Sequence, residues 1–289
     1  MLAPHLSEHL KMPQALKRIP PFPAVAIQLL RTAANEYARL RELSDLVRAD
    51  AAFSSDILRT ANSSLYGLRT EIDSILQATL LLGLERVKAI VVTTAMKNYV
   101  GGLLNADWMR ACWRHNLACA VVAEDLSAGT LVEEDVAYTA GLMHDIGRLA
   151  LGVGYSDQYG DFLANTANIA NAKLELECER TLFGMSHCEA GAAIASSWEL
   201  PATIARVIAR HHDPVAPREF DVLAIIRISC LVADALGFEA FHHHPPRSYA
   251  ELREQLPEED RKRLPSEPDG LTFHIASAIN SIETASRAS

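Results

Sequence analysis

The chain has 289 residues and a formal net charge of −9, with 49% hydrophobic and 22% charged residues. This composition is that of an ordinary globular protein, and it excludes a chain that is disordered over most of its length. The acidic balance argues against non-specific binding to nucleic acid or to an anionic membrane surface, because either partner needs a basic protein surface.

The apolar runs of the chain are short. Residues 89–95 and 223–236 are the most apolar, and both are too short or too polar to cross a bilayer. The N-terminus lacks the basic segment and apolar run of a secretory signal. The five cysteines form no CxxC pair, which excludes a zinc ribbon and is typical of a reducing compartment. We therefore expect a cytoplasmic protein without nucleic-acid or membrane partners, with most cysteines as small core residues.

Apolar residues recur at helical spacing from the start of the chain onward. The first such segments are 25–30, 43–47, 57–61, 75–82 and 87–96. Asp73 and Ser74 can cap the segment that runs to Gly83, and Pro201 suits the first turn of a helix that reaches His211. Alternation with a period of two is scarce. The pattern predicts an all-α protein.

Two glycines, Gly101 and Gly102, favour a helix stop and a boundary between two lobes. We expect an N-terminal helical lobe over residues 1–104 and a larger helical lobe over residues 105–289. Segment 241–270 is rich in Pro, His, Glu and Arg, which indicates a surface excursion before a last helix around 271–282.

Segment 141–149 carries the strongest local signal. Its apolar residues are spaced to face a helical core, and His144 and Asp145 interrupt that run. Adjacent residues on a helix diverge by about 100° yet can both reach one ion at the helix flank. An imidazole and a carboxylate are common ligands of divalent metals, but two ligands alone do not hold an ion. Other helices must supply more.

Further histidines and one aspartate lie at suitable places in other predicted helices. They are His115, His187, His211, His212 and Asp234. Asp234 lies in a segment that otherwise appears buried, where a carboxylate needs a compensating charge. A metal ion would supply that charge, and the alanines on either side of Asp234 would leave room for it.

Each of these residues also has an ordinary structural interpretation. A lone His115 is more often a core histidine bonded to a carbonyl group. Asp234 could pair with Arg227, which lies two turns earlier on the same face. His187 could be a first-turn helix residue at the surface, and His211 and His212 could be cations at a helix C-terminus, where the helix dipole favours them. We favour a metal site because the residues occur together, and we expect Asp234 to be a ligand.

The order His, His-Asp, His, His-His, Asp resembles that of the HD superfamily of metal-dependent phosphohydrolases. The first half of the chain resembles HDOD, the HD-related output domain of bacterial signalling proteins. The residues that carry this resemblance are those of segments 19–25, 58–67, 75–84 and 113–115, together with His144 and Asp145. The resemblance covers residues 13–236, and it implies two packed all-helical lobes, the second of them HD-like.

Differences between this chain and the family patterns limit which functions of those families can be expected of it. Many HDOD members lack HD ligands and act as non-catalytic interaction modules, whereas this chain has a residue at every core position. The related HD-GYP cyclic-di-GMP phosphodiesterases have a Glu one turn before the first His, where this chain has Ala111. Their Gly-Tyr-Pro segment is also absent, because His212 is followed by Asp213 and Pro214. Both differences argue against hydrolysis of cyclic-di-GMP.

The donor types suit a divalent transition metal, which is iron, manganese, nickel or zinc, better than they suit calcium. One ion is expected in preference to two, because the absent Glu leaves a second site short of ligands. We expect Asp145 and Arg148 to carry any catalysis. Arg148 lies one turn after His144 and could neutralise a phosphate oxygen, or it could be an exposed arginine.

Two functional classes follow from the resemblance. The first is a signal-transduction output module with a retained metal site, whose partner is a signalling protein or a small phosphorylated ligand. The second is an active metal-dependent phosphohydrolase that acts on a nucleotide or another phosphoester. The complete ligand set favours the enzyme. The neighbours of the His-Asp pair, Met143 and Ile146, supply no general base, which favours the module.

Overall fold

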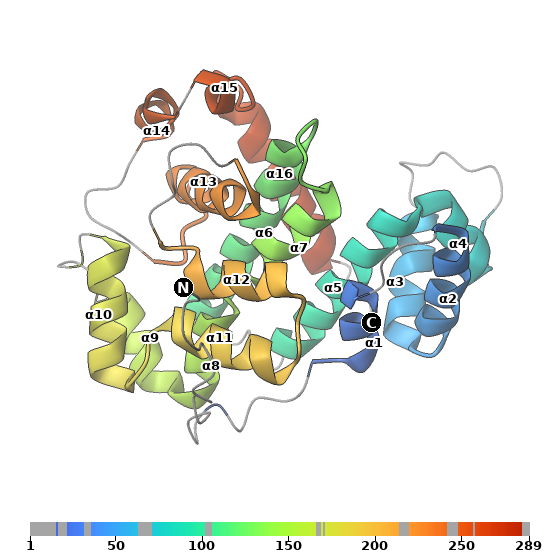
Figure 1. The fold of residues 1–289 in the computed structure, drawn as a ribbon, viewed down its shortest axis with the longest axis horizontal. Helices are drawn as coiled ribbons and strands as arrows, with labels where there is room; N and C mark the ends of the chain where they lie inside the picture. The colour runs from blue at the N-terminus through green and yellow to red at the C-terminus, as the bar shows by residue number, and fades with distance from the viewer. Residues whose placement is uncertain are drawn as a thin grey trace, which may run out of the picture.

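The computed structural model describes residues 16, 22–31, 36–62, 71–101, 106–165, 169, 171–213, 220–241, 248–256 and 258–284. In these ranges all the regular elements are helices, with no strand among them (Figure 1). The prediction of an all-α fold is therefore confirmed. No helix in the described ranges is long and apolar enough to cross a membrane.

A first group of helices packs together at one end of the molecule (Figure 1). It contains α1 (Ala24–Arg31), α2 (Glu36–Arg48), α3 (Ala51–Ala61), α4 (Ile75–Leu82) and α5 (Leu84–Gly101). The Ser74 side chain accepts a hydrogen bond from the Gln77 amide, so the predicted cap of α4 is confirmed. The Asn62 side chain bonds both backbone groups of Ile72 and so joins the end of α3 to the start of α4.

The helices that follow form a larger group around α6, which is buried along most of its length by α7, α13 and α16. They are α6 (Asp107–Ser127), α7 (Glu134–Met143), α8 (Ile146–Gly154), α9 (Ser156–Ala164), α10 (Ala172–Phe183), α11 (His187–Ser197), α12 (Ala202–Arg210), α13 (Val222–Ala235), α14 (Tyr249–Gln255), α15 (Glu258–Arg261) and α16 (Asp269–Thr284). The predicted surface excursion contains α14, whose Tyr249 and Leu252 are buried. The three consecutive histidines at 242–244 lie outside the described residues.

Helix α5 joins the two groups by packing on α7 as well as on its own group. Thr93 and Tyr138 share a buried hydrogen bond of 2.9 Å, and Lys88 pairs with Asp135 at 3.1 Å. A second junction lies just before α1, where the Phe22 ring stacks on Trp198 with 5.0 Å between ring centroids. The boundary between residues 104 and 105 stays a prediction, because residues 102–105 lie outside the described ranges.

Candidate metal centre

The His-Asp pair occupies the break between two helices. His144 ends α7, and Asp145 stands directly before α8. Two glycines let the helices on either side of this break lie close to neighbouring helices. A Cβ on Gly141 would lie 2.7 Å from the Ala120 Cα of α6, and a Cβ on Gly147 would lie 1.8 Å from the His187 carbonyl oxygen of α11. The glycines therefore let the backbones of α7 and α8 touch α6 and α11, which brings other histidines to the break.

Asp145 lies at the centre of the cluster. Its Oδ1 is 3.4 Å from His187 Nε2 and 3.4 Å from His211 Nε2. His212 Nε2 is 3.1 Å from His187 Nε2. Two ligand atoms about 2.1 Å from one metal ion lie roughly 3 to 3.4 Å apart, so each of these three pairs could share an ion. In the described residues the mutually close ligand atoms form one group of His144, Asp145 and His211 and another of His187, Cys188, His211 and His212. Asp145 Oδ1 and His211 Nε2 are buried without a hydrogen-bond partner in the described part of the chain.

Hydrogen bonds orient the rings of the cluster. A backbone carbonyl or a carboxylate can only accept, so the ring Nδ1–H donates and the Nε2 lone pair points the other way. Three rings donate to carbonyl oxygens, and the fourth donates to a carboxylate. The pairs are His115 to Phe238 at 2.9 Å, His144 to Gly141 at 2.7 Å, His211 to Ile208 at 3.1 Å and His187 to Glu179 at 2.7 Å. Metal-binding histidines in proteins have this arrangement.

Arg148 lies in the core beside the central carboxylate. It is only 3% exposed, so the interpretation as an exposed arginine is wrong. Its Nε donates to Asp145 Oδ2 at 2.5 Å, and its NH1 bonds Glu175 and lies 3.7 Å from Glu179. The guanidinium therefore pairs with three buried carboxylates, and its single charge can balance one of them. Its expected role toward a phosphate stays a prediction, and in this structure its main partners are Asp145 and the two glutamates.

Sequence reasoning missed Glu175 and Glu179, which are fully buried on α10. Glu179 accepts from the His187 ring, from the His187 amide and from the Tyr159 hydroxyl, each at 2.7 Å. The two residues are one helical turn apart, and Phe183 continues the same buried face. This spacing is the feature of the sequence that could have indicated a buried pair of glutamates. The helix also carries exposed charges, among which a buried pair does not stand out.

Charges around the cluster shift its pKa values strongly. Burial alone would raise the pKa of Asp145, but the charges of Arg148 and His187 hold it well below its usual value. Burial and Arg148 both act to lower the pKa of His187, yet the anions around its ring, first among them Glu179, raise it to about 10. Burial and two neighbouring histidines lower the pKa of His212. Asp145 is therefore ionised, and a cation bound at this place would contact a negatively charged carboxylate.

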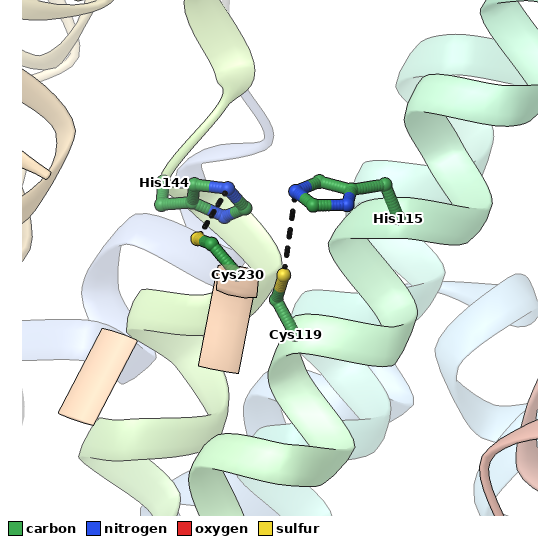
Figure 2. Close-up of side chains that lie close together, drawn as sticks. All are labelled: His115, Cys119, His144 and Cys230. Atoms are coloured by element: carbon green, nitrogen blue, oxygen red, sulfur yellow. Dashed lines mark hydrogen bonds between the residues drawn. The ribbon is translucent and has the colours of Figure 1, made fainter. Parts of the chain in front are cut away.

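Two imidazoles and two thiols form a second cluster, which shares His144 with the group that contains Asp145 (Figure 2). His144 Nε2 is 3.4 Å from Cys230 Sγ, and His115 Nε2 is 3.4 Å from Cys119 Sγ. A hydrogen bond from Cys119 is the largest cause that holds the pKa of Cys230 well below its usual value. The expectation that most cysteines are small core residues holds for Cys112 and Cys119, which belong to the apolar core, and Cys119 and Cys230 also lie beside imidazoles.

Asp234 lies beside His115 and away from the central carboxylate. Its Oδ1 is 3.4 Å from His115 Nδ1, the nitrogen that also faces the Phe238 carbonyl, and its side chain is 35% exposed. None of the groups of mutually close ligand atoms in the described residues includes Asp234. Its role as a ligand stays a prediction. The contact with Nδ1 instead orients the His115 ring.

A cavity of about 30 Å³ opens onto the cluster. Its lining includes Asp145, Arg148, His212, Cys230 and Phe241. The volume suffices for an ion or a water molecule, whereas pockets for ligands of drug size measure roughly 300 to 1,000 Å³. A larger hollow of about 420 Å³ lies between α5 and the α6–α7 turn, and acidic side chains dominate its charged lining. That charge opposes a phosphorylated ligand.

Comparison with known proteins relates most of the chain to one family. Residues 19–214 match the family model of the HDOD domain. An uncharacterised protein of Treponema pallidum (strain Nichols) is 24% identical over 238 residues, which are 80% of this chain and 45% of that protein. The chain therefore spans about half the length of this curated relative.

Solved structures show the same fold. An HDOD domain protein of unknown function from Geobacter sulfurreducens has a TM-score of 0.72 and 23% identity, with 94% of this chain and 95% of that chain covered. A protein from Shewanella amazonensis SB2B, provisionally named a metal-dependent phosphohydrolase, has a TM-score of 0.58 and 22% identity, with 93% and 94% covered. At these identities the likeness concerns the fold.

Proposed function

Because the chain belongs to the HDOD family, we propose that it is a bacterial signal-transduction output module with a working metal site. The ion is held by Asp145, His187, His211 and His212. One observation carries this proposal: Asp145 Oδ1 and His211 Nε2 face each other in the core, and each lacks a hydrogen bond in the described part of the chain. Leaving both atoms unpaired is costly, and an ion between them removes that cost.

The donor set supports the class of ion. Three imidazoles and one carboxylate suit iron, manganese, nickel or zinc. Glu179 and the Ile208 carbonyl fix the rings of His187 and His211, and Arg148 holds the second oxygen of Asp145. A bound ion of this class can lower the pKa of a water molecule and polarise a phosphoryl group.

The surroundings of the site favour a module over an enzyme. The adjoining cavity of about 30 Å³ does not admit a nucleotide, and the guanidinium of Arg148 is engaged by carboxylates. The expected partner is a signalling protein, or a small phosphorylated ligand that binds elsewhere. A net charge of −9 favours neither nucleic acid nor membrane. The cytoplasm is the compartment that suits the free cysteines.

One observation favours a second candidate function, which is phosphoester hydrolysis. The cavity borders Asp145, His212 and Arg148, so a phosphoryl oxygen that entered it would meet both the metal ligands and a cation. The site residues in this case bind and orient the phosphoryl group. Access would require Phe241, which lies 5.6 Å from the Arg148 guanidinium, to move.

The test of the proposal combines metal analysis with an activity panel. Protein purified without added metal is expected to contain a transition metal, and Asp145→Asn is expected to contain one ion fewer per chain. The panel covers phosphomonoesters, phosphodiesters and nucleotides, and we expect no turnover by the metal-loaded protein. If the protein turns over one substrate, and both Asp145→Asn and His212→Gln abolish that turnover, the protein is an enzyme and the proposal of a non-catalytic module is wrong. Absence of metal from the wild type under all loading conditions would overturn the metal site itself.

Removal of the metal is expected to lower the melting temperature without unfolding the protein. An ion present at 100 times its Kd stabilises the folded state by about 2.7 kcal/mol. For a chain of this length that corresponds to roughly 5 °C. The apolar core holds the fold without the ion. Differential scanning calorimetry with and without a chelator measures the shift, with His212→Gln as the control in which the shift should be smaller.

Metal uptake at neutral pH is expected to release protons. The anions around His187 raise its pKa to about 10, and the pKa of His211 is raised above its usual value, so an ion competes with protons for both rings. The pKa of His212 is lowered, so this ring competes less with protons. An ion held by these residues therefore displaces protons, and its affinity weakens as pH falls. Titration calorimetry in two buffers of different ionisation enthalpy gives the count, and equal heats in both would contradict it.

A further inference from the structure

The cluster in Figure 2 has the composition of a metal site in its own right. It joins two imidazoles and two thiols: His115 and Cys119 of α6, His144 at the end of α7, and Cys230 of α13. We propose that these four side chains bind a zinc ion as a Cys₂His₂ site, separate from the ion at Asp145. The inference goes beyond the proposed function, because it concerns sulfur ligands and a second ion.

The geometry supports a tetrahedral ion. The four ligand atoms lie within 4.8 Å of one another, and each of the two nitrogen–sulfur pairs is separated by 3.4 Å. With zinc–sulfur bonds of about 2.3 Å and zinc–nitrogen bonds of about 2.0 to 2.1 Å, the edges of a tetrahedral site measure roughly 3.3 to 3.8 Å. A small inward movement of the side chains would complete it.

Hydrogen bonds orient the two imidazole rings for metal binding. His115 donates through Nδ1 to the Phe238 carbonyl, and His144 donates through Nδ1 to the Gly141 carbonyl. Both rings therefore direct the Nε2 lone pair at sulfur. Helix α6 presents His115 and Cys119 on one face because they are four residues apart. Three elements distant in sequence thus aim soft and borderline donors at one point.

Charge balance favours a zinc ion at this depth. Cys119 and His115 are buried, and Cys230 is half-buried. A divalent ion with two thiolates and two neutral imidazoles has no net charge, so it can lie in the core without the cost of a buried charge. Entry is available, because His115, His144 and Cys230 also line the cavity of about 30 Å³. Sulfur ligands select zinc over manganese or magnesium.

Simple thiol–imidazole hydrogen bonds explain each pair taken alone. They do not explain why the two pairs converge. His144 has one free ring nitrogen and can serve one ion, and that nitrogen lies 3.4 Å from Cys230 Sγ but 4.0 Å from Asp145 Oδ2. We therefore assign His144 to the sulfur cluster, and the ion at Asp145 is bound by His187, His211 and His212.

Cobalt substitution tests the proposal on the full chain. Cobalt(II) in a tetrahedral site with thiolates gives an intense sulfur-to-metal charge-transfer band, which nitrogen and oxygen ligands do not give. The reduced, metal-free protein is titrated with cobalt, and bound metal is counted by elemental analysis. We expect two ions per chain and the sulfur band in the wild type. Cys119→Ser and Cys230→Ser are each expected to lose the band and one ion.

Two controls separate this site from the one at Asp145. Cys178→Ser, at a cysteine outside these clusters, should keep both ions and the band. His212→Gln should lose one ion and keep the band. Melting curves in chelator show whether Cys119→Ser, at a buried position, still folds, and the half-buried Cys230→Ser repeats the test where folding is less at risk.

The outcomes distinguish the two proposals. One bound ion without a sulfur band, unaffected by Cys230→Ser, would overturn this inference and leave the proposed function intact. One ion with a sulfur band, unaffected by His212→Gln, would support this inference and overturn the site at Asp145. A disulfide between Cys119 and Cys230 in protein kept under reductant, found by mass spectrometry, would also overturn the zinc site.

Discussion

Replacement of Arg148 by methionine is expected to lower the free energy of unfolding by about 3 to 5 kcal/mol, the usual cost of removing one partner from a buried ion pair. Arg148 is 3% exposed and pairs with Asp145, Glu175 and Glu179, all of them buried. Methionine fills similar space but leaves these carboxylates without their cation. Chemical denaturation in the presence of chelator measures the loss without a contribution from bound metal.

A matched control is the exposed ion pair of Arg206 and Asp221, whose nitrogen–oxygen distance is 2.7 Å. Arg206→Met is expected to cost no more than about 1 kcal/mol, because water screens exposed pairs. The double variant Arg148→Met with Glu175→Gln should regain part of the lost stability, since it removes one of the stranded charges. Equal losses for the two arginine variants would contradict the assignment of Arg148 as a buried counter-ion.

Replacement of Gly147 by alanine is expected to cost about 3 kcal/mol, the upper part of the range for overpacked sites. The added Cβ would lie 1.8 Å from the His187 carbonyl oxygen and 2.8 Å from the Gly191 nitrogen. Both atoms belong to the backbone of α11, so no side-chain rotation relieves the contact. Helices α8 and α11 must move apart, which separates Asp145 from His187 and should lower the metal content as well.

The control for this prediction is Gly270→Ala. A Cβ on Gly270 would meet open space, so the melting temperature should stay the same or rise slightly. Calorimetry of both variants, with metal analysis of the same samples, gives the comparison. A Gly147→Ala protein with wild-type stability and full metal content would show that α8 and α11 are not held as closely as described.

The sequence was sufficient to predict the helices, and it pointed to residues that the structure brings close together. Periodicity predicted the all-α fold, because a 3.6-residue repeat of apolar residues can be recognised in the sequence without knowledge of how the helices pack. The His-Asp pair was visible as a polar interruption between Leu142 and Leu149. That His187, His211 and Asp145 would meet was an expectation from their order, and the structure brings their ligand atoms to 3.4 Å.

The partners of these residues were harder to find. Whether Arg148 faces solvent or carboxylates depends on α10, which lies 24 residues later in the chain and contributes Glu175 and Glu179. No local pattern encodes that contact. Cys119 did leave a local signal, since it follows His115 by four residues on one helix. Cys230 had none, because a cysteine in an apolar helix is typical of a core residue.

Helix α11 connects the ion site with the segment that leads into α1. It begins at His187 and ends at Ser197, and Trp198, the residue after it, stacks on Phe22 of that segment. Eleven residues of helix span about 16 Å. A displacement of His187 along the helix axis would be transmitted to the indole of Trp198. We therefore expect loading of the ion site and the packing of the N-terminal helices to change together.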